Sequence, residues 1–396
     1  MINVKVAIFF LQLCLLNTFF LFRHIQYYED QQLHDTERKF TYHHHQDMVI
    51  TKNERTRKIV VIGGPHKTGS TSLHENLVHW IQTHEGFSHW RWPVPKDHPN
   101  DDLAWGFGHL AWTFVPKKCN ETYYYYIFPG DWDQLSCKTI QDIYRDEIDA
   151  QWSAGYDLVI GTEEFDFISQ NRESLAIDID QLLNTIVPWK HDPNAEKGEV
   201  HWVVKYRSPR ASHLISGWHQ CCADTMTFLE FLNKYPKLTF AAYFVDSLFY
   251  VERLLQHPDI HVVLMGISDL NDTEHEKVDA STIVACNLLG IPCDQYDTFA
   301  TGNNEKPIVS NVKTGIGNMG KYFTEDMIPH IEHVFRRRDC AYAHLLSKDN
   351  LQLLYAHDLV KLLSDCLARG DTGITRDTMI SSLLHIAHGK GLPEGI

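Results

Sequence analysis

The sequence lacks an excess of positive charge: 36 Lys and Arg stand against 51 Asp and Glu, a formal net charge of −15. Broad nucleic-acid binding depends on basic side chains that neutralise phosphates, so we expect no nucleic-acid partner. A local basic pocket for a small anion stays compatible with this charge. Nine cysteines among 396 residues are too few for a small disulfide scaffold, and no internal repeat is present. Hydrophobic residues at 43% and charged residues at 22% instead indicate a globular protein.

One long apolar run is present, over residues 6–22. As a helix, about 17 residues would span roughly 25 Å, just enough for a thin bilayer. The residues that follow include no small side chains suited to signal-peptide cleavage, so residues 1–23 are interpreted as a retained signal anchor. A cleaved signal peptide, which would give a secreted protein, is the alternative. Sequons at Asn120 and Asn271 agree with a lumenal body.

The rest of the chain divides into three predicted parts. Residues 24–57 are polar and rich in histidine, and they predict a stem. Residues 58–346 form the predicted main domain. Residues 347–396 have a Leu-rich pattern that predicts a C-terminal extension of one or two helices.

The main domain alternates buried strands with amphipathic helices. Short β-branched runs predict strands over 58–63, 156–160, 200–205 and 260–265. Helix-like stretches lie between them, over 70–83, 140–154, 177–186, 225–232 and 246–256. This alternation predicts an α/β fold, a three-layer sandwich in which helices flank a mainly parallel central sheet. In such sheets ligands bind at the carboxyl ends of strands.

A long insertion over residues 86–129 carries Trp90, Trp92, Trp105 and Trp112 and the four tyrosines 123–126. Flat aromatic rings there would suit a sugar-binding cleft. The alternative is a satellite hydrophobic cluster under a long loop.

A glycine-bearing turn follows the first strand, at Gly64 to Gly69, and leads into a helix. Such a turn directs backbone N–H groups and the positive end of the helix at one point, which suits a phosphate or sulfate. The two glycines have the spacing of the nucleotide-triphosphate loop, so the fold is P-loop-like. However, Ser70 stands where that loop has lysine, and Lys67 comes three positions earlier. No strand-end Asp of the Mg²⁺-binding kind is evident either, so we expect an anion other than Mg-ATP.

The segment 65–73 resembles the 5′-phosphosulfate-binding loop of sulfotransferases, which use 3′-phosphoadenosine 5′-phosphosulfate (PAPS) as sulfate donor. The resemblance implies that Lys67 donates to the bridging oxygen as the sulfuryl group leaves, and that no metal is required. It also implies that the cofactor is held by the whole turn, namely His66, Lys67, Thr68, Gly69, Ser70, Thr71 and Ser72.

A second resemblance lies after the strand 200–205. Arg207, a proline two residues later and a serine-bearing helix are similar to the motif that holds the 3′-phosphate of PAPS. The family spaces its Arg and Ser by eight residues, whereas Ser216 lies nine after Arg207, so the serine is either Ser216 or Ser212. Lys313 opens a degenerate glycine-rich segment, similar to the loop that closes on the 3′-phosphate. Residues 336–342 resemble the closing helix of Golgi carbohydrate sulfotransferases.

Sulfuryl transfer to a hydroxyl needs a base. The third strand region ends in Glu163 and Glu164, which would point to opposite sides if the segment stays extended. Glu163 is the preferred base and Glu164 the second candidate. Because some relatives use histidine, His66, His74 and His109 stay as alternatives.

These observations predict an enzyme that transfers a sulfuryl group from PAPS to a hydroxyl of a glycan or glycoconjugate. It would be a single-pass type II Golgi membrane protein with a lumenal catalytic domain. The alternatives are a non-catalytic glycan-binding protein on the same fold, a nucleotide-dependent kinase and a tyrosylprotein sulfotransferase. Disulfide pairing and oligomeric state stay open.

Overall fold

A computed structural model of the chain describes residues 56–64, 70–98, 106–115, 132, 135–169, 177–221, 226–234, 246–268, 280–292 and 326–396. The expected signal anchor, nearly all of the expected stem and both sequons lie outside these residues. Among the helices of these ranges, none is long and apolar enough to cross a membrane.

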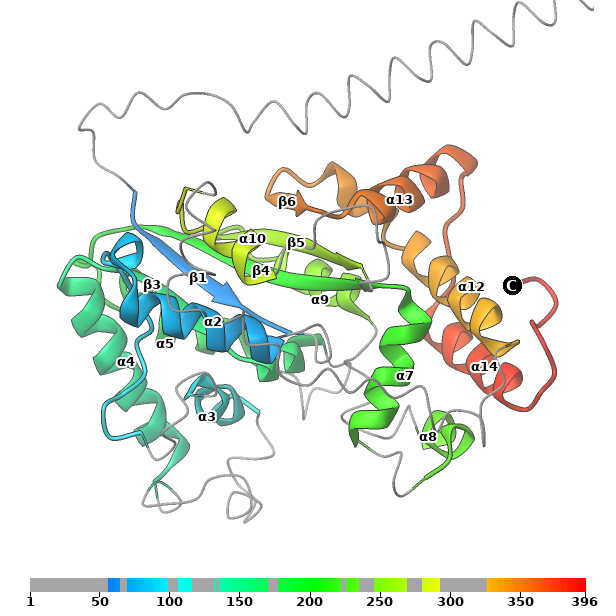
Figure 1. Cartoon of the computed structure of the whole chain (residues 1–396), viewed down its shortest axis with the longest axis horizontal. Helices are drawn as coiled ribbons and strands as arrows, with labels where there is room; N and C mark the ends of the chain where they lie inside the picture. Colours follow the sequence, from blue (N-terminus) through cyan, green and yellow to red (C-terminus); the bar gives the residue numbers. More distant parts are fainter. Residues whose placement is uncertain are drawn as a thin grey trace, which may run out of the picture. The chain divides into compact units, whose positions relative to one another are not determined.

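The centre of the fold is a parallel sheet of six strands in the order β2-β3-β1-β4-β5-β6 (Figure 1). The strands are β1 (Lys58–Ile62), β2 (Trp90–Arg91), β3 (Asp157–Gly161), β4 (Glu199–Ser208), β5 (Ile260–Ser268) and β6 (Leu351–Leu354). Every residue of β3 is buried, and so are four of the five in β1. Burial of both faces is the condition under which near-continuous β-branched runs form parallel strands.

Helices cover the sheet on two sides (Figure 1). On one face α2 (Ser70–Thr83) contacts α10 (Ala280–Asn287), and Asn76 Nδ2 donates a hydrogen bond of 3.0 Å to Ser281 Oγ. Elsewhere α9 (Ser247–Leu254) packs on β4 and β5, while α4 (Cys137–Ser153) packs on β3 and on α5 (Ile179–Ile186). The α/β three-layer sandwich predicted from the sequence is therefore confirmed.

The other helices are η2 (Glu85–Phe87), α3 (Gly106–Thr113), η6 (Glu163–Ser169), α6 (Pro188–His191), α7 (Arg210–Cys221), α8 (Phe228–Lys234), α12 (Met327–Cys340), η9 (Ala343–Ser347), α13 (His357–Arg369) and α14 (Arg376–Ala387). Four of them, α7, α8, α12 and α14, share a hydrophobic cluster of their own beside the sheet. This lateral helix cluster is seen on the right of Figure 1.

The strand order places a topological switch between β1 and β4. From β1 the chain crosses to the side of β2 and β3, whereas from β4 it moves on to β5 and β6. Loops that leave neighbouring strands in opposite directions open a crevice at their carboxyl ends, and ligands of open α/β sheets bind there. The two loops at this switch are the turn after β1 and the segment after β4. These are the two places where the sequence predicts anion-binding residues.

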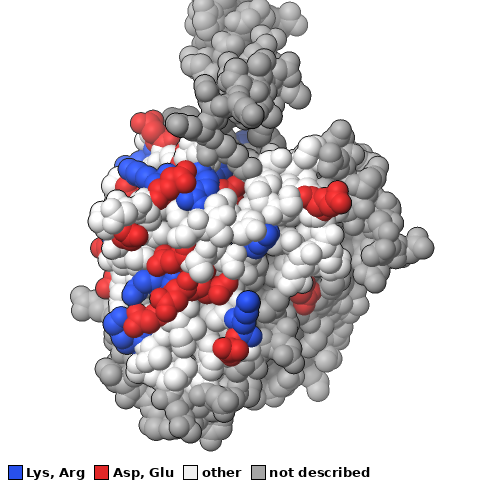
Figure 2. All heavy atoms as spheres, turned by 90° about the vertical axis from the view of Figure 1, so that its left-hand side faces the viewer, with Lys and Arg blue, Asp and Glu red and all other residues white. Residues whose placement is uncertain are grey.

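The face that carries α4 presents both signs of charge. Figure 2 shows basic and acidic side chains intermixed on it. Asp142 illustrates the pattern, because Lys138 Nζ lies 2.6 Å and Arg145 Nη1 2.9 Å from the same carboxylate oxygen. Exposed pairs of this kind contribute only about 0–1 kcal/mol each. Their main effect is to keep the described part of this face from being uniformly basic or acidic.

The C-terminal residues are more than the helical extension expected for 347–396. Two helices, α13 and α14, do lie there, but β6 also pairs with β5 and extends the sheet beyond residue 346. The helix α14 contributes to the lateral helix cluster through Met379 and Leu383. A Leu-rich pattern did not separate β6 from the helices around it, because a four-residue strand is too short to show a period.

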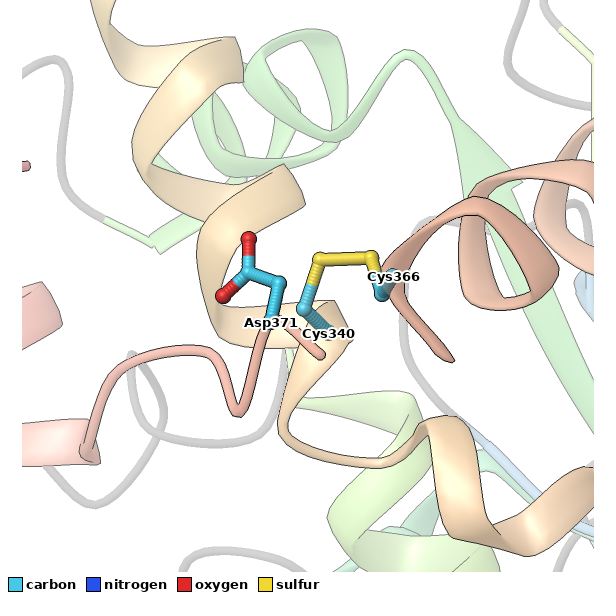
Figure 3. A group of neighbouring side chains, drawn as sticks. All are labelled: Cys340, Cys366 and Asp371. Carbon is cyan, nitrogen blue, oxygen red and sulfur yellow. A yellow bond between two sulfur atoms is a disulfide. The ribbon is translucent and has the colours of Figure 1, made fainter. Parts of the chain in front are cut away.

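A disulfide joins α12 to α13. Cys340 and Cys366 are 26 positions apart, with their Cα atoms 5.5 Å from each other. Asp371 lies beside them, so that one ligand atom from each of the three residues falls within 4.8 Å of the others (Figure 3). Both sulfurs are in the S–S bond and neither offers the thiolate that a metal ligand requires. This group is therefore a covalent link, not a metal site.

Replacement of Cys340 and Cys366 by alanine should lower the free energy of unfolding by roughly 2–4 kcal/mol, because the unfolded chain gains conformational freedom. Urea denaturation under non-reducing conditions measures this loss. The single variants provide the control: each breaks the same bond, so each should lose about as much as the double variant. Losses that simply add would contradict a shared covalent link.

Candidate functional site

The turn after β1 begins against three side chains that leave no space for a Cβ atom. A Cβ on Gly63 would lie 2.4 Å from the hydroxyl of Tyr250 and 2.9 Å from Trp202 Nε1. A Cβ on Gly64 would lie 2.4 Å from Cβ of Asp166. Both glycines are therefore required by close approach, and the segments η6, β4 and α9 fix the point where the loop leaves the sheet.

Backbone hydrogen bonds hold the same point to β4. Gly63 N donates to Val203 O at 3.0 Å, and Lys205 N donates to Gly64 O at 3.3 Å. Since β1 ends at Ile62, these two bonds continue its pairing into the turn. The strand β4 runs on past β1 to Ser208, and so carries its last residues beyond the start of the loop.

Four buried ionisable side chains lie near the carboxyl ends of β1, β3 and β4, and we call them the strand-end cluster: His74, Glu163, Asp166 and Lys205. They come from α2, η6 and β4, and none is more than 5% exposed. Burial lowers the pKa of Lys205 to about 8, and the nearby carboxylates of Glu163 and Asp166 oppose part of that effect. Burial, followed by the Lys205 charge, lowers the pKa of His74 well below its usual value. At neutral pH the lysine of the cluster is therefore largely charged, and the imidazole is neutral.

The ring of His74 packs directly on the end of β3. A Cβ on Gly161 would lie 3.0 Å from His74 Nε2 and 2.7 Å from Cη2 of Trp92. Within the described part of the chain this Nε2 has no hydrogen-bond partner. His74 was an alternative base, but its burial at 2% exposure places it away from solvent.

The side chains of the two candidate carboxylates after β3, Glu163 and Glu164, point in different directions. The sequence predicted this from an extended segment, but the structure shows another cause. The segment is not extended, because η6 is a 3₁₀ helix in which successive side chains turn by about 120°. Glu163 lies in the strand-end cluster. Glu164 is only half-buried and accepts a hydrogen bond from the Thr162 hydroxyl. A Cβ on Gly108 of α3 would lie 3.5 Å from Glu164 Oε2, so this carboxylate faces α3.

His109, the third histidine considered as a base, is part of a packed aromatic group. His98 Nε2 and His109 Nδ1 are 2.6 Å apart, and both rings lie against Trp132. Burial, followed by the charge of His98, lowers the pKa of His109 to about 3. The ring of His109 is therefore a packed part of the core, and it is not exposed to an acceptor.

The structure describes part of the predicted insertion over residues 86–129, including three of its four tryptophans. Trp90, Trp92 and Trp112 are buried, the last two at 9% and 6% exposure. Trp90 Nε1 also donates to Leu289 O at 3.1 Å, which ties the insertion to the end of α10. These three rings belong to the core and not to an open sugar-binding surface. Trp105 and the tyrosines 123–126 lie outside the described residues.

After β4 the structure distinguishes two arginines. Arg210 is fully buried, with Nε 3.8 Å from Asp339 Oδ2, and Tyr206 donates to the same oxygen at 2.7 Å. Arg207 is partly exposed near the end of the strand, where it pairs with Ile267 of β5. Arg210 therefore holds α7 against α12, and Arg207 is the partly exposed arginine of the two.

The two serines proposed for the second motif share a face. Ser212 and Ser216 are one turn apart on α7, and both are partly exposed. The structure thus keeps both as candidates. Ser70 and Thr71 begin α2, where only their backbone is described, and Ser72 is half-buried. His66, Lys67, Thr68, Gly69 and Lys313 lie outside the described residues.

The sequence reasoning missed three residues of this site: Asp166, Lys205 and Tyr250. One signal was available, since Lys205 is a charged residue directly after the apolar run 202–204. A buried lysine requires a counter-charge. The spacing of the sequence does not show which carboxylates supply it.

Comparisons with known proteins add no relative: no protein-family model, curated protein or solved structure matches this chain. Function is therefore inferred from the residues and their geometry.

Substitution of Gly64 by alanine should lower the free energy of unfolding by about 1–3 kcal/mol, because the new methyl overlaps Asp166. Gly108→Ala is the matched control: its methyl meets only an ordinary contact at 3.5 Å, and alanine favours helix α3. Thermal and urea unfolding of both variants measure the difference. Equal stability of Gly64→Ala and the wild type would show that Asp166 does not pack on the loop.

Proposed function

We propose that this chain is a PAPS-dependent sulfotransferase that acts on a hydroxyl of a glycan or glycoconjugate. One observation carries the proposal: the turn with Lys67 follows β1, Arg207 lies at the carboxyl end of β4, and these strands are neighbours at the topological switch. A donor with a phosphosulfate at one end and a 3′-phosphate at the other needs two anion-binding groups at one crevice. Arg207 lies four residues beyond Val203, the partner of Ile62, which is about 13 Å along an extended strand.

In this reaction the acceptor oxygen forms a bond to sulfur while the bond from sulfur to the bridging phosphate oxygen breaks. The products are a sulfate ester and 3′-phosphoadenosine 5′-phosphate. Lys67 would stabilise the negative charge that builds on the leaving oxygen, and a fixed ammonium is most effective when that charge is largest. The guanidinium of Arg207 would hold the 3′-phosphate, since its planar fork can donate two bonds at once.

The acceptor proton would pass to a carboxylate after β3. The sequence favours Glu163, but burial favours Glu164, because Glu163 is enclosed with Lys205 and Glu164 is half-buried toward α3. A base must come within hydrogen-bond reach of the acceptor hydroxyl. Within the proposal, Glu164 is therefore the base and Glu163 supports the strand-end cluster.

The cellular setting belongs to the same proposal. Residues 1–23 would anchor the protein in the Golgi membrane, with residues 24–57 as a stem and the catalytic domain in the lumen. Of the alternatives, a glycan-binding protein would use the tryptophans of the insertion, and the three described ones are buried. A tyrosylprotein sulfotransferase differs only in its acceptor, so an acceptor panel separates the two.

Transfer of labelled sulfate from PAPS to a panel of glycans and tyrosine peptides tests the proposal directly. We expect Lys67→Ala to lower kcat by about 10²–10³, the usual cost of removing one group that stabilises developing charge. The exposed Lys348 provides a matched control, and Lys348→Ala should retain full activity. A wild-type protein with no transfer to any acceptor, and no thermal shift with PAPS, would refute the proposal.

Arg207→Ala should weaken binding of 3′-phosphoadenosine 5′-phosphate about tenfold to a hundredfold, as expected for loss of a charge-assisted hydrogen bond. Isothermal titration measures this, with Arg369→Ala on the exposed end of α13 as control. The penalty should disappear for adenosine 5′-monophosphate, which lacks the 3′-phosphate. An equal penalty for both nucleotides would place Arg207 elsewhere on the ligand.

Glu164→Gln should lower kcat by about 10²–10⁴ with little change in thermal stability. Glu163→Gln should instead lower the unfolding temperature, because Lys205 would lose one of its two counter-charges. Activity and thermal unfolding of both variants are measured side by side. Full activity of Glu164→Gln would return the role of base to Glu163.

A further inference from the structure

Two buried carboxylates lie where many phosphate-binding proteins hold a divalent cation. Glu163 and Asp166 follow β3, the strand beside β1, and Asp166 packs on the first residues of the loop after β1. Carboxylates next to a phosphate-binding loop are ordinary ligands of Mg²⁺. The arrangement raises the question of what balances their charge.

The strand on the other side of β1 supplies a cation. Lys205 of β4 is fully buried, and its backbone N–H donates to Gly64 O, the same glycine on which Asp166 packs. The charges of Glu163 and Asp166 act on its ammonium group, and the charge of that group acts on His74. Gly64 thus contacts the backbone of Lys205 on one side and the side chain of Asp166 on another.

We propose that the ammonium group of Lys205 is a built-in substitute for a divalent cation. It neutralises Glu163 and Asp166 beside Gly64, where the loop that carries Lys67 begins, so that the loop can bind an anion without a metal. The inference does not depend on which anion binds there, and holds for a sulfotransferase or for another anion-binding protein.

Removal of the lysine charge should convert the cluster into a metal site. Lys205→Met retains most of the volume but leaves two buried carboxylates without their cation, an arrangement that disfavours folding. Mn²⁺ supplies the missing charge, and carboxylates are good ligands for this ion. Binding to the folded state alone raises the unfolding temperature.

The experiment compares thermal unfolding midpoints of the full chain in EDTA and in Mn²⁺. We expect no site-specific shift for the wild type, and a rise of roughly 3–6 °C for Lys205→Met when Mn²⁺ is well above its Kd. Lys190→Met is the matched control, because it breaks a pair with Asp259 at the surface. Its response to Mn²⁺ should not exceed that of the wild type.

A charge-neutral variant, Glu163→Gln/Asp166→Asn/Lys205→Met, keeps the test decisive if Lys205→Met folds poorly. It should be recovered in higher yield than Lys205→Met and should show no response to Mn²⁺, since no buried charge is left to compensate. Recovery of Lys205→Met only in the presence of Mn²⁺ would also support the proposal.

Three results would overturn it. The first is a Lys205→Met midpoint that Mn²⁺ does not change. The second is a wild-type response to Mn²⁺ that disappears in Glu163→Gln/Asp166→Asn, which would mean that the lysine does not fill the position. The third is a neutral triple variant that folds no better than Lys205→Met. None of these measurements uses PAPS, so their failure and that of the sulfuryl-transfer assay are distinguishable.

Discussion

The contact between Asp166 and Gly64 is the constraint on which the rest of the site depends. A carboxylate lies directly on the backbone where the chain leaves β1, and Lys205 lies beside it with its own N–H bonded to Gly64. Burial of an isolated carboxylate is costly, and an ion pair of poor geometry does not repay that cost. The loop follows β1. The opposite charges come from the two neighbours of β1: the carboxylates follow β3, and the lysine lies on β4. Parallel order is what makes this possible, because the carboxyl ends of all three strands meet at one edge.

The buried carboxylate of Asp339 distinguishes the two arginines near the end of β4, because it pairs with Arg210 and not with Arg207 in the contacts described above. Arg210 is enclosed with Asp339 and Tyr206, and this group joins the start of α7 to the end of α12. The connection fixes the direction in which the chain passes from β4 to α7, and with it the position of Arg207, which lies three residues earlier in β4. The sequence marked Arg207 as the candidate of this segment and gave no role to Arg210, which lies three residues later. Burial, which the sequence does not state, separates them.

The sheet was predictable where local pattern was strong. β1, β3, β4 and β5 are β-branched runs, and burial on both faces is what such runs require. β2 has two residues and β6 has four, too few for any period, so both depend on tertiary pairing. The positions of Glu163 and Arg207 at strand ends were predicted for the same local reason. The partnership of Lys205 with Glu163 and Asp166 was not, because residues about 40 positions apart meet only once β3 and β4 take places on either side of β1.

Glu163 and Glu164 point in different directions, so the first belongs to the strand-end cluster and the second is the carboxylate nearer to the proposed acceptor. One carboxylate is used to balance Lys205, and the next one along η6 faces α3 across Gly108. A hydroxyl that approaches Glu164 must therefore pass beside α3, a helix fixed from behind by the contact of His109 with His98 and Trp132. A side chain larger than alanine at position 108 would cover the carboxylate, since even a Cβ there lies 3.5 Å from it. Acceptor selectivity of the proposed enzyme should therefore depend on the size of the side chain at position 108, the one residue of α3 that is not buried.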